Sequence, residues 1–262
     1  MPYVQVDGLR LHYLVQGFGP AVVLIHGLGS CAEDWSLLQA PTLSQRYRVL
    51  MPDLRGHGRS DKPPGPYTVH QMAEDIAGFL RALGTDSAHI VGFSLGGAVA
   101  QALAVRHPER VRSLVLVNTF AYLRPKGWVE WRLTLARWGT LLVDLALHAR
   151  LEAKEVFPRP DQAGLRRVAY HRLCANDPAA YRAAMMAATQ YDGRRDLGRL
   201  RAPTLVVAGR EDPVIPLRAK EELATGIPGA RLMIIPRSGH ATPTDQPVVF
   251  NRILLDFLRQ HS

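Results

Sequence analysis

One pentapeptide, Gly-Phe-Ser-Leu-Gly at positions 92–96, constrains this chain more than any other stretch. The apolar residues before it, 88–91, predict a buried strand, and the alanine-rich residues 97–104 predict a helix. A serine at such a junction lies on a sharp turn that exposes its hydroxyl at the end of a sheet. The turn is crowded, so the positions two before and two after the serine must be small, and both are glycine here. The pattern favours a nucleophilic Ser94 over a chance match to a common loop motif.

A histidine base and an orienting acid follow Ser94 in the chain order serine, acid, histidine. The strand predicted over 204–209 is followed by Asp212, and the strand predicted over 231–235 is followed by His240. Open parallel sheets place their chemistry at the carboxyl ends of strands, so the three side chains are expected to meet there. We expect His240 to accept the serine proton and Asp212 to orient the imidazole.

Positions 211 and 118 are the other places from which the acid could come. Glu211 precedes Asp212, but Pro213 rigidifies the turn after Asp212 and favours that residue. The strand predicted over 114–117 ends at Asn118, where no carboxylate is available. Asp212 is therefore the predicted acid.

An oxyanion hole requires two main-chain N–H donors. The amide of Leu95, directly after the serine, is the first expected donor. The strand predicted over 22–25 leads into His26-Gly27-Leu28-Gly29, whose glycines allow close approach of a substrate, and the Leu28 amide is the second. For His26 we expect a structural role, in which hydrogen bonds from its ring hold this loop.

These motifs together resemble the α/β-hydrolase family along nearly the whole chain. The resemblance implies an α/β fold with a mostly parallel sheet, helices on both faces and a helical cap. It also implies a nucleophile at Ser94, an acid at Asp212, a base at His240 and oxyanion donors at Leu28 and Leu95. Dehalogenases and epoxide hydrolases of this fold use an aspartate nucleophile, so Ser94 argues against both. The matching pieces are residues 26–29, 53–60, 92–96, 209–212 with Pro216, and 239–240.

Predicted strands and helices alternate through the first 118 residues and again after residue 201, as a parallel sheet covered on both faces requires. Thr68–Leu83 predicts an amphipathic helix that Thr68 caps, and Val248–Leu258 predicts the last helix. Residues 120–200 show no strand pattern and several broad apolar helical faces. We therefore expect a core of residues 1–119 and 201–262 and a cap of residues 120–200. The residues expected to line the substrate pocket are Gly27, Cys31, Phe93, Trp128, Trp131, Met185 and Met186.

Composition excludes several classes of protein. The net charge is +9, and residues 121–200 carry most of the excess, but the basic residues are scattered, so nucleic-acid binding is not expected. A solvated arginine-rich surface explains this charge better than steering of an acidic substrate, the second interpretation. The sequence shows no membrane span, no signal-peptide pattern and no Cys/His spacing for a metal. Two distant cysteines need no disulfide, and we expect a reducing cytoplasm.

The predicted function is cofactor-free hydrolysis of carboxylic esters with short to medium acyl chains, through an acyl-enzyme. A second prediction uses the same triad on a lactone, as in 3-oxoadipate enol-lactonases, or on a C–C bond. A third is a non-catalytic receptor that keeps the fold as a small-ligand pocket. The expected partner is a small ester or lactone, whereas the natural substrate and the oligomeric state stay open.

Overall fold

The computed structural model describes residues 2–123 and 127–262; within helix α5 the side chains of 129–131, 133, 134, 136 and 137 are outside this description. Over the described residues, one 8-stranded sheet has the strand order β1-β2-β4-β3-β5-β6-β7-β8. The strands are β1 (Tyr3–Val6), β2 (Leu9–Gln16), β3 (Ala21–Ile25), β4 (Arg48–Pro52), β5 (Ala88–Phe93), β6 (Val111–Val117), β7 (Thr204–Gly209) and β8 (Arg231–Ile235). The first hairpin and the β2–β4 pair are antiparallel, and all other pairs are parallel.

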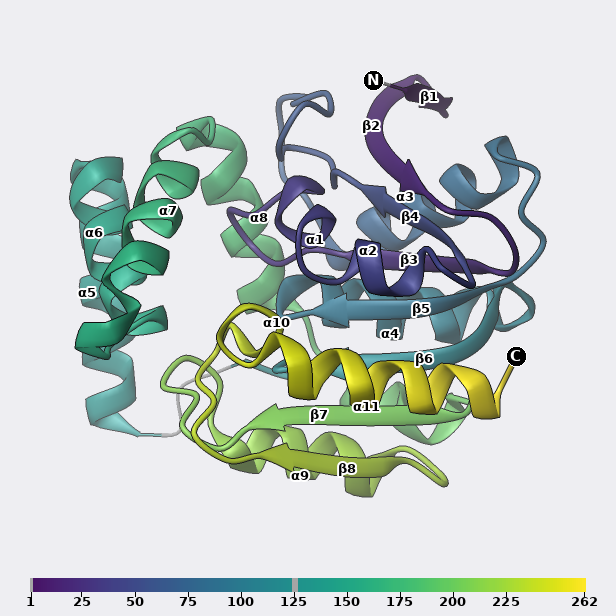
Figure 1. Ribbon diagram of the computed structural model, residues 1–262. Coiled ribbons are helices and arrows are strands. Elements are labelled where there is room, and N and C mark those ends of the chain that lie inside the picture. Colours follow the sequence, from purple (N-terminus) through teal and green to yellow (C-terminus); the bar gives the residue numbers. More distant parts are fainter. Residues whose placement is uncertain (1, 124–126) are drawn as a thin grey trace.

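Helices cover both faces of the sheet and also extend beyond one end of it (Figure 1). Three short 3₁₀ segments, Pro108–Arg110, Pro160–Gln162 and Arg194–Arg199, complete the structure of the described residues. The α-helices are α1 (Glu33–Ser36), α2 (Ala40–Leu43), α3 (Val69–Ala82), α4 (Leu95–Arg106), α5 (Trp128–Val143), α6 (Leu145–Val156), α7 (Ala163–Cys174), α8 (Pro178–Gln190), α9 (Leu217–Gly226), α10 (Thr242–Asp245) and α11 (Pro247–Gln260).

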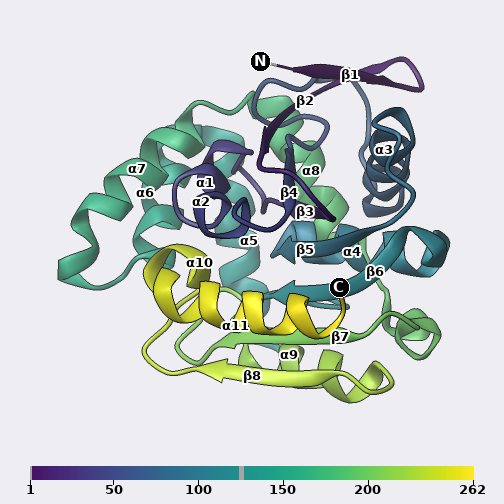
Figure 2. The same cartoon turned by 45° about the vertical axis from the view of Figure 1, so that its right-hand side comes forward.

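Alternation along the central strands divides the core into two layers. On β3, Val23 and Ile25 pack into the layer formed with α3, α4 and α9. Val22 and Leu24, one residue out of phase, pack into the layer formed with α1, α2 and α11. In Figures 1 and 2 the yellow α11 crosses one face of the sheet, with α4 and α9 on the other. Because both faces are covered, the central strands consist mostly of apolar residues.

Local signals in the sequence position α3 as expected. Thr68 is extended and its hydroxyl accepts a hydrogen bond of 3.0 Å from the main-chain N–H of Gln71, which caps the helix. Gly84 follows the helix with a φ of +60°, a conformation that favours glycine. The predicted helix at 68–83 is thus confirmed to within one residue at each end.

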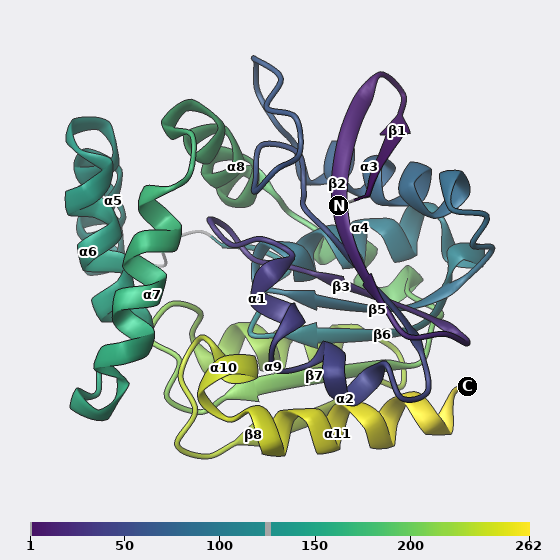
Figure 3. The same cartoon turned by 45° about the horizontal axis from the view of Figure 1, so that its top comes forward.

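The residues between β6 and β7 form the helices α5 to α8, with no strand pairing in the described part beyond one isolated bridge. That bridge joins Tyr122 to Asp192, and the N–H of Gly193 donates to the oxygen of Ala121 at 2.8 Å. Figures 1 and 3 show α5, α6 and α7 beyond the arrowheads of β5 to β8. The two ends of this helical insertion, residues 120–200, are therefore held together where it leaves the sheet.

Candidate active site

Ser94 occupies the tight turn between β5 and α4. Its φ is 52°, and its main-chain N–H donates to the oxygen of Val117 at 3.0 Å. A Cβ on Gly92 would lie 2.3 Å from the oxygen of Gly96, and one on Gly96 would lie 2.4 Å from the oxygen of Ile25. No real Cβ tolerates such distances, so both glycines are required by backbone packing. This crowding is what the sequence pattern indicated.

The three side chains expected to cooperate lie in hydrogen-bond contact. His240 Nε2 is 3.1 Å from Ser94 Oγ. Its Nδ1 lies 3.1 Å and 3.0 Å from the two carboxylate oxygens of Asp212. With Nδ1–H donated to the carboxylate, Nε2 is free to accept the serine proton, as a general base requires.

Asp212 is held as a buried carboxylate. Its Oδ1 accepts hydrogen bonds from the main-chain N–H groups of Val214 (2.8 Å) and Ile215 (3.0 Å). Its Oδ2 accepts one of 2.7 Å from the ammonium group of Lys220. Burial by itself raises the pKa of Asp212, but His240 and Lys220 outweigh burial and lower the pKa to about 2. Asp212 is therefore ionised at neutral pH. The neighbouring Glu211 is exposed, and the hydrogen-bond partners of the His240 ring among the described residues are Asp212 and Ser94.

Two residues that sequence reasoning missed support this arrangement. Lys220 lies on α9, and nothing in the sequence distinguishes it from other helical lysines. Asn118 follows β6, and its side chain bonds to main-chain groups of Gly209, Gly239 and His240. A polar residue immediately after an apolar strand was the available signal, but its partners are far away in sequence.

Two main-chain amides point to an anion site beside the serine. Leu95 begins α4, where helical N–H groups have no partner within the helix. Among the described residues, no hydrogen bond from the amide of Leu28 or Leu95 to another protein group is present. Both residues line the cavity next to Ser94. They therefore offer the two donors that an oxyanion needs.

His26 fixes the loop that carries Leu28. Its Nδ1 lies 2.8 Å from the oxygen of Gly27, and its Nε2 accepts from the N–H of Leu54 at 3.0 Å. Burial lowers the pKa of His26, which keeps the ring neutral and suits one donor and one acceptor nitrogen. The structural role expected for His26 matches these contacts.

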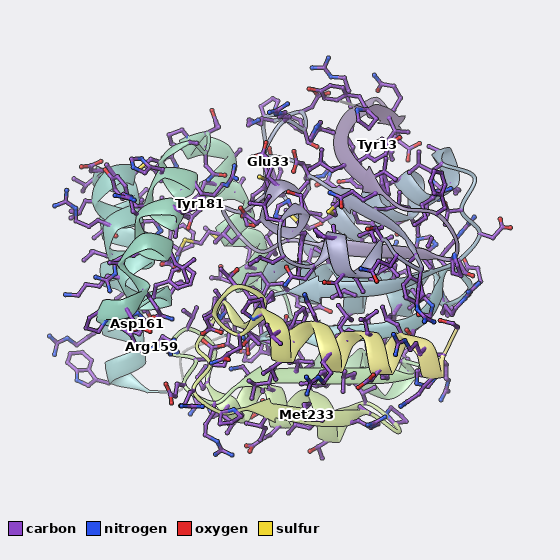
Figure 4. All side chains as sticks on the ribbon, viewed as in Figure 1. Tyr13, Glu33, Arg159, Asp161, Tyr181 and Met233 are labelled. Carbon is purple, nitrogen blue, oxygen red and sulfur yellow. The ribbon has the colours of Figure 1, made fainter. Side chains whose placement is uncertain are left out.

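A cavity of about 1230 Å³ opens above Ser94, between the core and the helical insertion. Apolar side chains form much of its wall, among them Phe120, Leu151, Phe157, Val168 and Leu173. Tyr181 on α8 and Glu33 on α1, both labelled in Figure 4, line it from the insertion and from the core. Ser94 thus lies against a cavity that is lined both by the core and by described residues of 120–200.

Of the residues expected to line the pocket, some line the cavity and others do not. Phe93 and Met185 line the cavity. Met186 is 41% exposed and Trp128 is 73% exposed, and neither lines the cavity, because both face outward from their helices. The prediction that these two line the pocket is therefore wrong. The side chain of Trp131 lies outside the described residues.

The two remaining pocket predictions concern the loop below the cavity. Gly27 is buried, and a Cβ there would lie 3.0 Å from the Phe93 ring, so this glycine packs against the wall instead of lining it. Cys31 is buried outside the lining, and burial raises the pKa of its thiol to about 12. Cys31 and Cys174 are both free thiols.

Among the described residues, those that line the cavity carry more negative than positive charge, although the chain as a whole is basic. The guanidinium of Arg172 pairs with Glu33 at 3.0 Å and with Asp34 at 3.2 Å, which ties α7 to α1. The acidic lining residues are Glu33, Asp34, Glu152, Glu155 and Glu222, and the lysine and arginine ones are Arg172 and Arg218. Among the described lysine and arginine side chains of residues 120–200, only Arg172 lines the cavity.

Neither a metal nor a bilayer is indicated by the described residues. Within 2–123 and 127–262, no group of three or more His, Cys, Asp or Glu side chains is arranged to hold a metal ion. No helix in the part of the chain that the structure describes has the length and apolar character needed to cross a bilayer.

Comparison with known proteins identifies the class to which this fold and site belong. The family model for the alpha/beta hydrolase fold matches residues 20–247. The chain belongs to the α/β-hydrolase family and is a hydrolase of that fold, as the motifs predicted.

Three similar proteins show the range of chemistry near this chain. It is 37% identical to a putative carbamate hydrolase, RutD, of Variovorax paradoxus (strain S110), with 97% of this chain and 98% of that protein covered. It is 36% identical to a 2-hydroxymuconate semialdehyde hydrolase of Pseudomonas putida, with 97% and 92% covered. The crystal structure of an enol-lactonase from Burkholderia xenovorans LB400 superposes with a TM-score of 0.87 at 30% identity, with 98% and 100% covered.

Proposed function

We propose that this protein is a serine hydrolase that cleaves carboxylic esters with short to medium acyl chains. The observation that carries the proposal is the 3.1 Å contact between His240 Nε2 and Ser94 Oγ at the floor of a largely apolar cavity. Unpaired amides at Leu28 and Leu95 complete the set of groups that acyl transfer requires.

The reaction proceeds in two half-reactions on this geometry. Ser94 Oγ attacks the ester carbonyl while its proton passes to His240 Nε2, and the amides of Leu28 and Leu95 stabilise the resulting oxyanion. Collapse of the tetrahedral intermediate breaks the bond to the alcohol, which takes the proton from His240. Water then attacks the acyl-enzyme with His240 as base, which releases the acid and restores Ser94. Asp212 holds the imidazole and stabilises its charged form throughout.

The helical insertion acts as the cap of this enzyme. Residues 1–119 and 201–262 supply the catalytic groups, and residues 120–200 supply the roof against which the acyl chain packs. Arg172 anchors the roof to α1, and the side-chain amide of Asn176 donates to the oxygen of Gly29 in the oxyanion loop at 3.0 Å. Selection among acyl chains thus depends on the fit between the roof and the loop that holds the carbonyl. The two free cysteines suit the reducing cytoplasm proposed for the protein.

The polarity of the cavity favours neutral esters over anionic lactones and over carboxylated C–C substrates. Acidic side chains outnumber basic ones among the described residues of its lining, and the guanidinium of Arg172 already pairs with two carboxylates. A negatively charged substrate would meet repulsion there and find few cationic partners. A receptor without catalysis is disfavoured because a complete triad would serve no purpose in it.

Carbamates are the second candidate substrates, and the relatives named as putative carbamate hydrolases favour them. The carbonyl of a carbamate reacts through the same addition at Ser94. An ester and a carbamate differ in the acyl group. In a carbamate, the carbonyl carbon is bonded to a nitrogen atom instead of an alkyl chain, and this nitrogen would enter the cavity.

Purified protein should be tested on p-nitrophenyl esters from C2 to C12, on an anionic enol-lactone and on aryl carbamates. Ser94→Ala is the active-site variant, and Ser44→Ala, outside the cavity lining, is its matched control. Turnover that peaks at short or medium esters and vanishes in Ser94→Ala alone supports the proposal. Fast opening of the lactone with negligible ester turnover would contradict it. Failure of a fluorophosphonate probe to label Ser94 would instead favour a receptor.

A further inference from the structure

Lys220 forms an ion pair with Asp212 that is completely removed from solvent. The two side chains have 0% exposed surface each, and Lys220 Nζ lies 2.7 Å from Asp212 Oδ2. The ammonium group also lies 3.5 Å from the oxygen of Gly209, at the end of β7. Burial lowers the pKa of Lys220, and the charge of Asp212 opposes that lowering. Removing a cation from water costs free energy, so we expect a buried lysine to have a specific role.

The triad does not need Lys220 to satisfy the hydrogen bonds of its acid. Asp212 Oδ1 already accepts from two main-chain amides and contacts His240. Oδ2 is shared between Lys220 at 2.7 Å and His240 Nδ1 at 3.0 Å. The ammonium group of Lys220 therefore places a positive charge next to Asp212 Oδ2, which is also in contact with His240 Nδ1.

We propose that Lys220 is a positioning residue of the triad, which fixes Asp212 and lowers the affinity of the Asp212–His240 pair for a proton. The inference rests on the proposed function. A positive charge 2.7 Å from Asp212 Oδ2 disfavours the addition of a proton to the Asp212–His240 pair, so the pair should keep its basic form at lower pH than it would without Lys220. Lys220 thereby extends the activity of the enzyme toward acid.

Other charged groups lie near the Asp212–His240 pair on neighbouring elements. Substitutions at Lys220 do not change these groups. On α10, Asp245 accepts hydrogen bonds from the N–H of Gly239 (2.7 Å) and the hydroxyl of Ser238 (2.9 Å). Arg159 acts electrostatically on Asp245. Arg218 and Glu222 on α9 and Glu155 on α6 line the cavity together with His240. A change at Lys220 alone leaves all of them in place.

The test replaces Lys220 by an uncharged residue of similar length. The acid limb is the part of the pH profile in which kcat/KM falls as the pH is lowered. In Lys220→Met and Lys220→Gln, this limb should move to higher pH by about one to two units. Lys220→Gln keeps a hydrogen-bond donor without the charge, and it also serves if Lys220→Met does not fold. Lys220→Arg keeps the charge and should leave the limb near its wild-type position. An unchanged limb in a folded Met or Gln variant overturns the proposal.

The matched control breaks a second buried ion pair far from the triad in sequence. Arg55 pairs with Asp75 on α3, outside the cavity lining. Arg55→Met should lower stability, as loss of a buried partner does, without moving the acid limb. A shift of similar size in Arg55→Met would assign the effect of Lys220 to loosened structure and overturn the proposal.

NMR titration of the His240 ring, assigned with His240→Gln, separates this inference from the proposed function. It needs no substrate, so it reports on Lys220 even if Ser94 is not labelled by a fluorophosphonate and the hydrolase proposal fails. The His240 midpoint should rise in Lys220→Met as the acid limb does. A midpoint that does not move, with Ser94 still labelled, contradicts only the role of Lys220.

Discussion

The side-chain amide of Asn118 donates a hydrogen bond of 2.6 Å to the main-chain oxygen of His240. The same nitrogen donates to the oxygen of Gly239 at 3.1 Å, and the Asn118 oxygen accepts from the N–H of Gly209 at 2.7 Å. Asn118 itself has a φ of 42°, a conformation that asparagine adopts more readily than most residues. One buried side chain thus joins the ends of β6 and β7 to the loop that carries the base.

Replacing Asn118 by aspartate should impair both stability and catalysis. Aspartate keeps the acceptor for Gly209 but turns the donor into an oxygen that faces the carbonyls of Gly239 and His240. We expect a loss of about 3 kcal/mol in the free energy of unfolding, and a fall in kcat of about 10- to 100-fold as His240 loses its position. Urea unfolding and ester kinetics on the folded fraction measure both.

A second asparagine provides the control for that experiment. Asn251, which itself does not line the cavity, lies on α11 and donates to the main-chain oxygen of Leu38 at 2.7 Å. Asn251→Asp should destabilise the protein but leave the kcat of the folded fraction unchanged. Equal falls in kcat for the two variants would contradict a specific role for Asn118.

Two glycine-to-alanine substitutions should have opposite effects on stability. In Gly96→Ala the new Cβ meets main-chain oxygens of Ile25 and His26 at 2.4 and 2.5 Å, which cannot move without distorting β3. A loss of about 2 kcal/mol or more is expected. A Cβ added to Gly139 in α5 would meet no atom of the described residues within 4 Å, so Gly139→Ala should stabilise by about 0.5–1 kcal/mol. Thermal unfolding compares the two, and similar losses would show that crowding is not the cause.

The adjacent methionines of α8 should differ in their effect on substrate choice. Met185 is 7% exposed and lines the cavity, whereas Met186 is 41% exposed and does not. Met185→Trp fills part of the acyl space, so the preferred p-nitrophenyl ester should become shorter, with kcat/KM for the longest accepted chain reduced about 10-fold or more. Met186→Trp should leave the chain-length profile as it is. A profile that Met185→Trp does not alter would place the acyl chain elsewhere.

His57 should make the stability of the protein depend on pH. Burial, assisted by the nearby His26, lowers the pKa of His57 to about 3, whereas an unfolded histidine titrates near pH ~6.5. Between these values the unfolded chain binds a proton that the folded protein does not, so the unfolding free energy falls as the pH falls. One histidine contributes a slope of about 1.4 kcal/mol per pH unit in this window.

Urea unfolding between pH 7 and pH 5 tests this dependence. His57→Gln should reduce the slope by the contribution of one proton, since His26 and His89, whose pKa values burial also lowers, remain in both proteins. Identical slopes in wild type and variant would mean that His57 is protonated in the folded state as well.

Short-range pattern was enough to predict that Ser94, Asp212 and His240 meet, because each follows a strand of a parallel sheet. Once Ser94, Asp212 and His240 are assigned to the ends of β5, β7 and β8, the fold itself brings them to one edge. The same reasoning failed for Trp128 and Met186, because a broad apolar helix does not reveal which of its faces turns inward. Their exposure depends on how the helices of the insertion pack against one another.

The sequence by itself determined the α/β-hydrolase fold, the tight turn at Ser94 and the chain order of Ser94, Asp212 and His240, since these depend on local sterics and on strand order. Only the tertiary structure decided that Asn118 holds the loop of His240, that Lys220 pairs with Asp212 and that carboxylates predominate among the described residues around the cavity. These contacts join residues from separate elements, and their energy depends on burial and distance. Neither quantity is encoded in the spacing of residues along the chain.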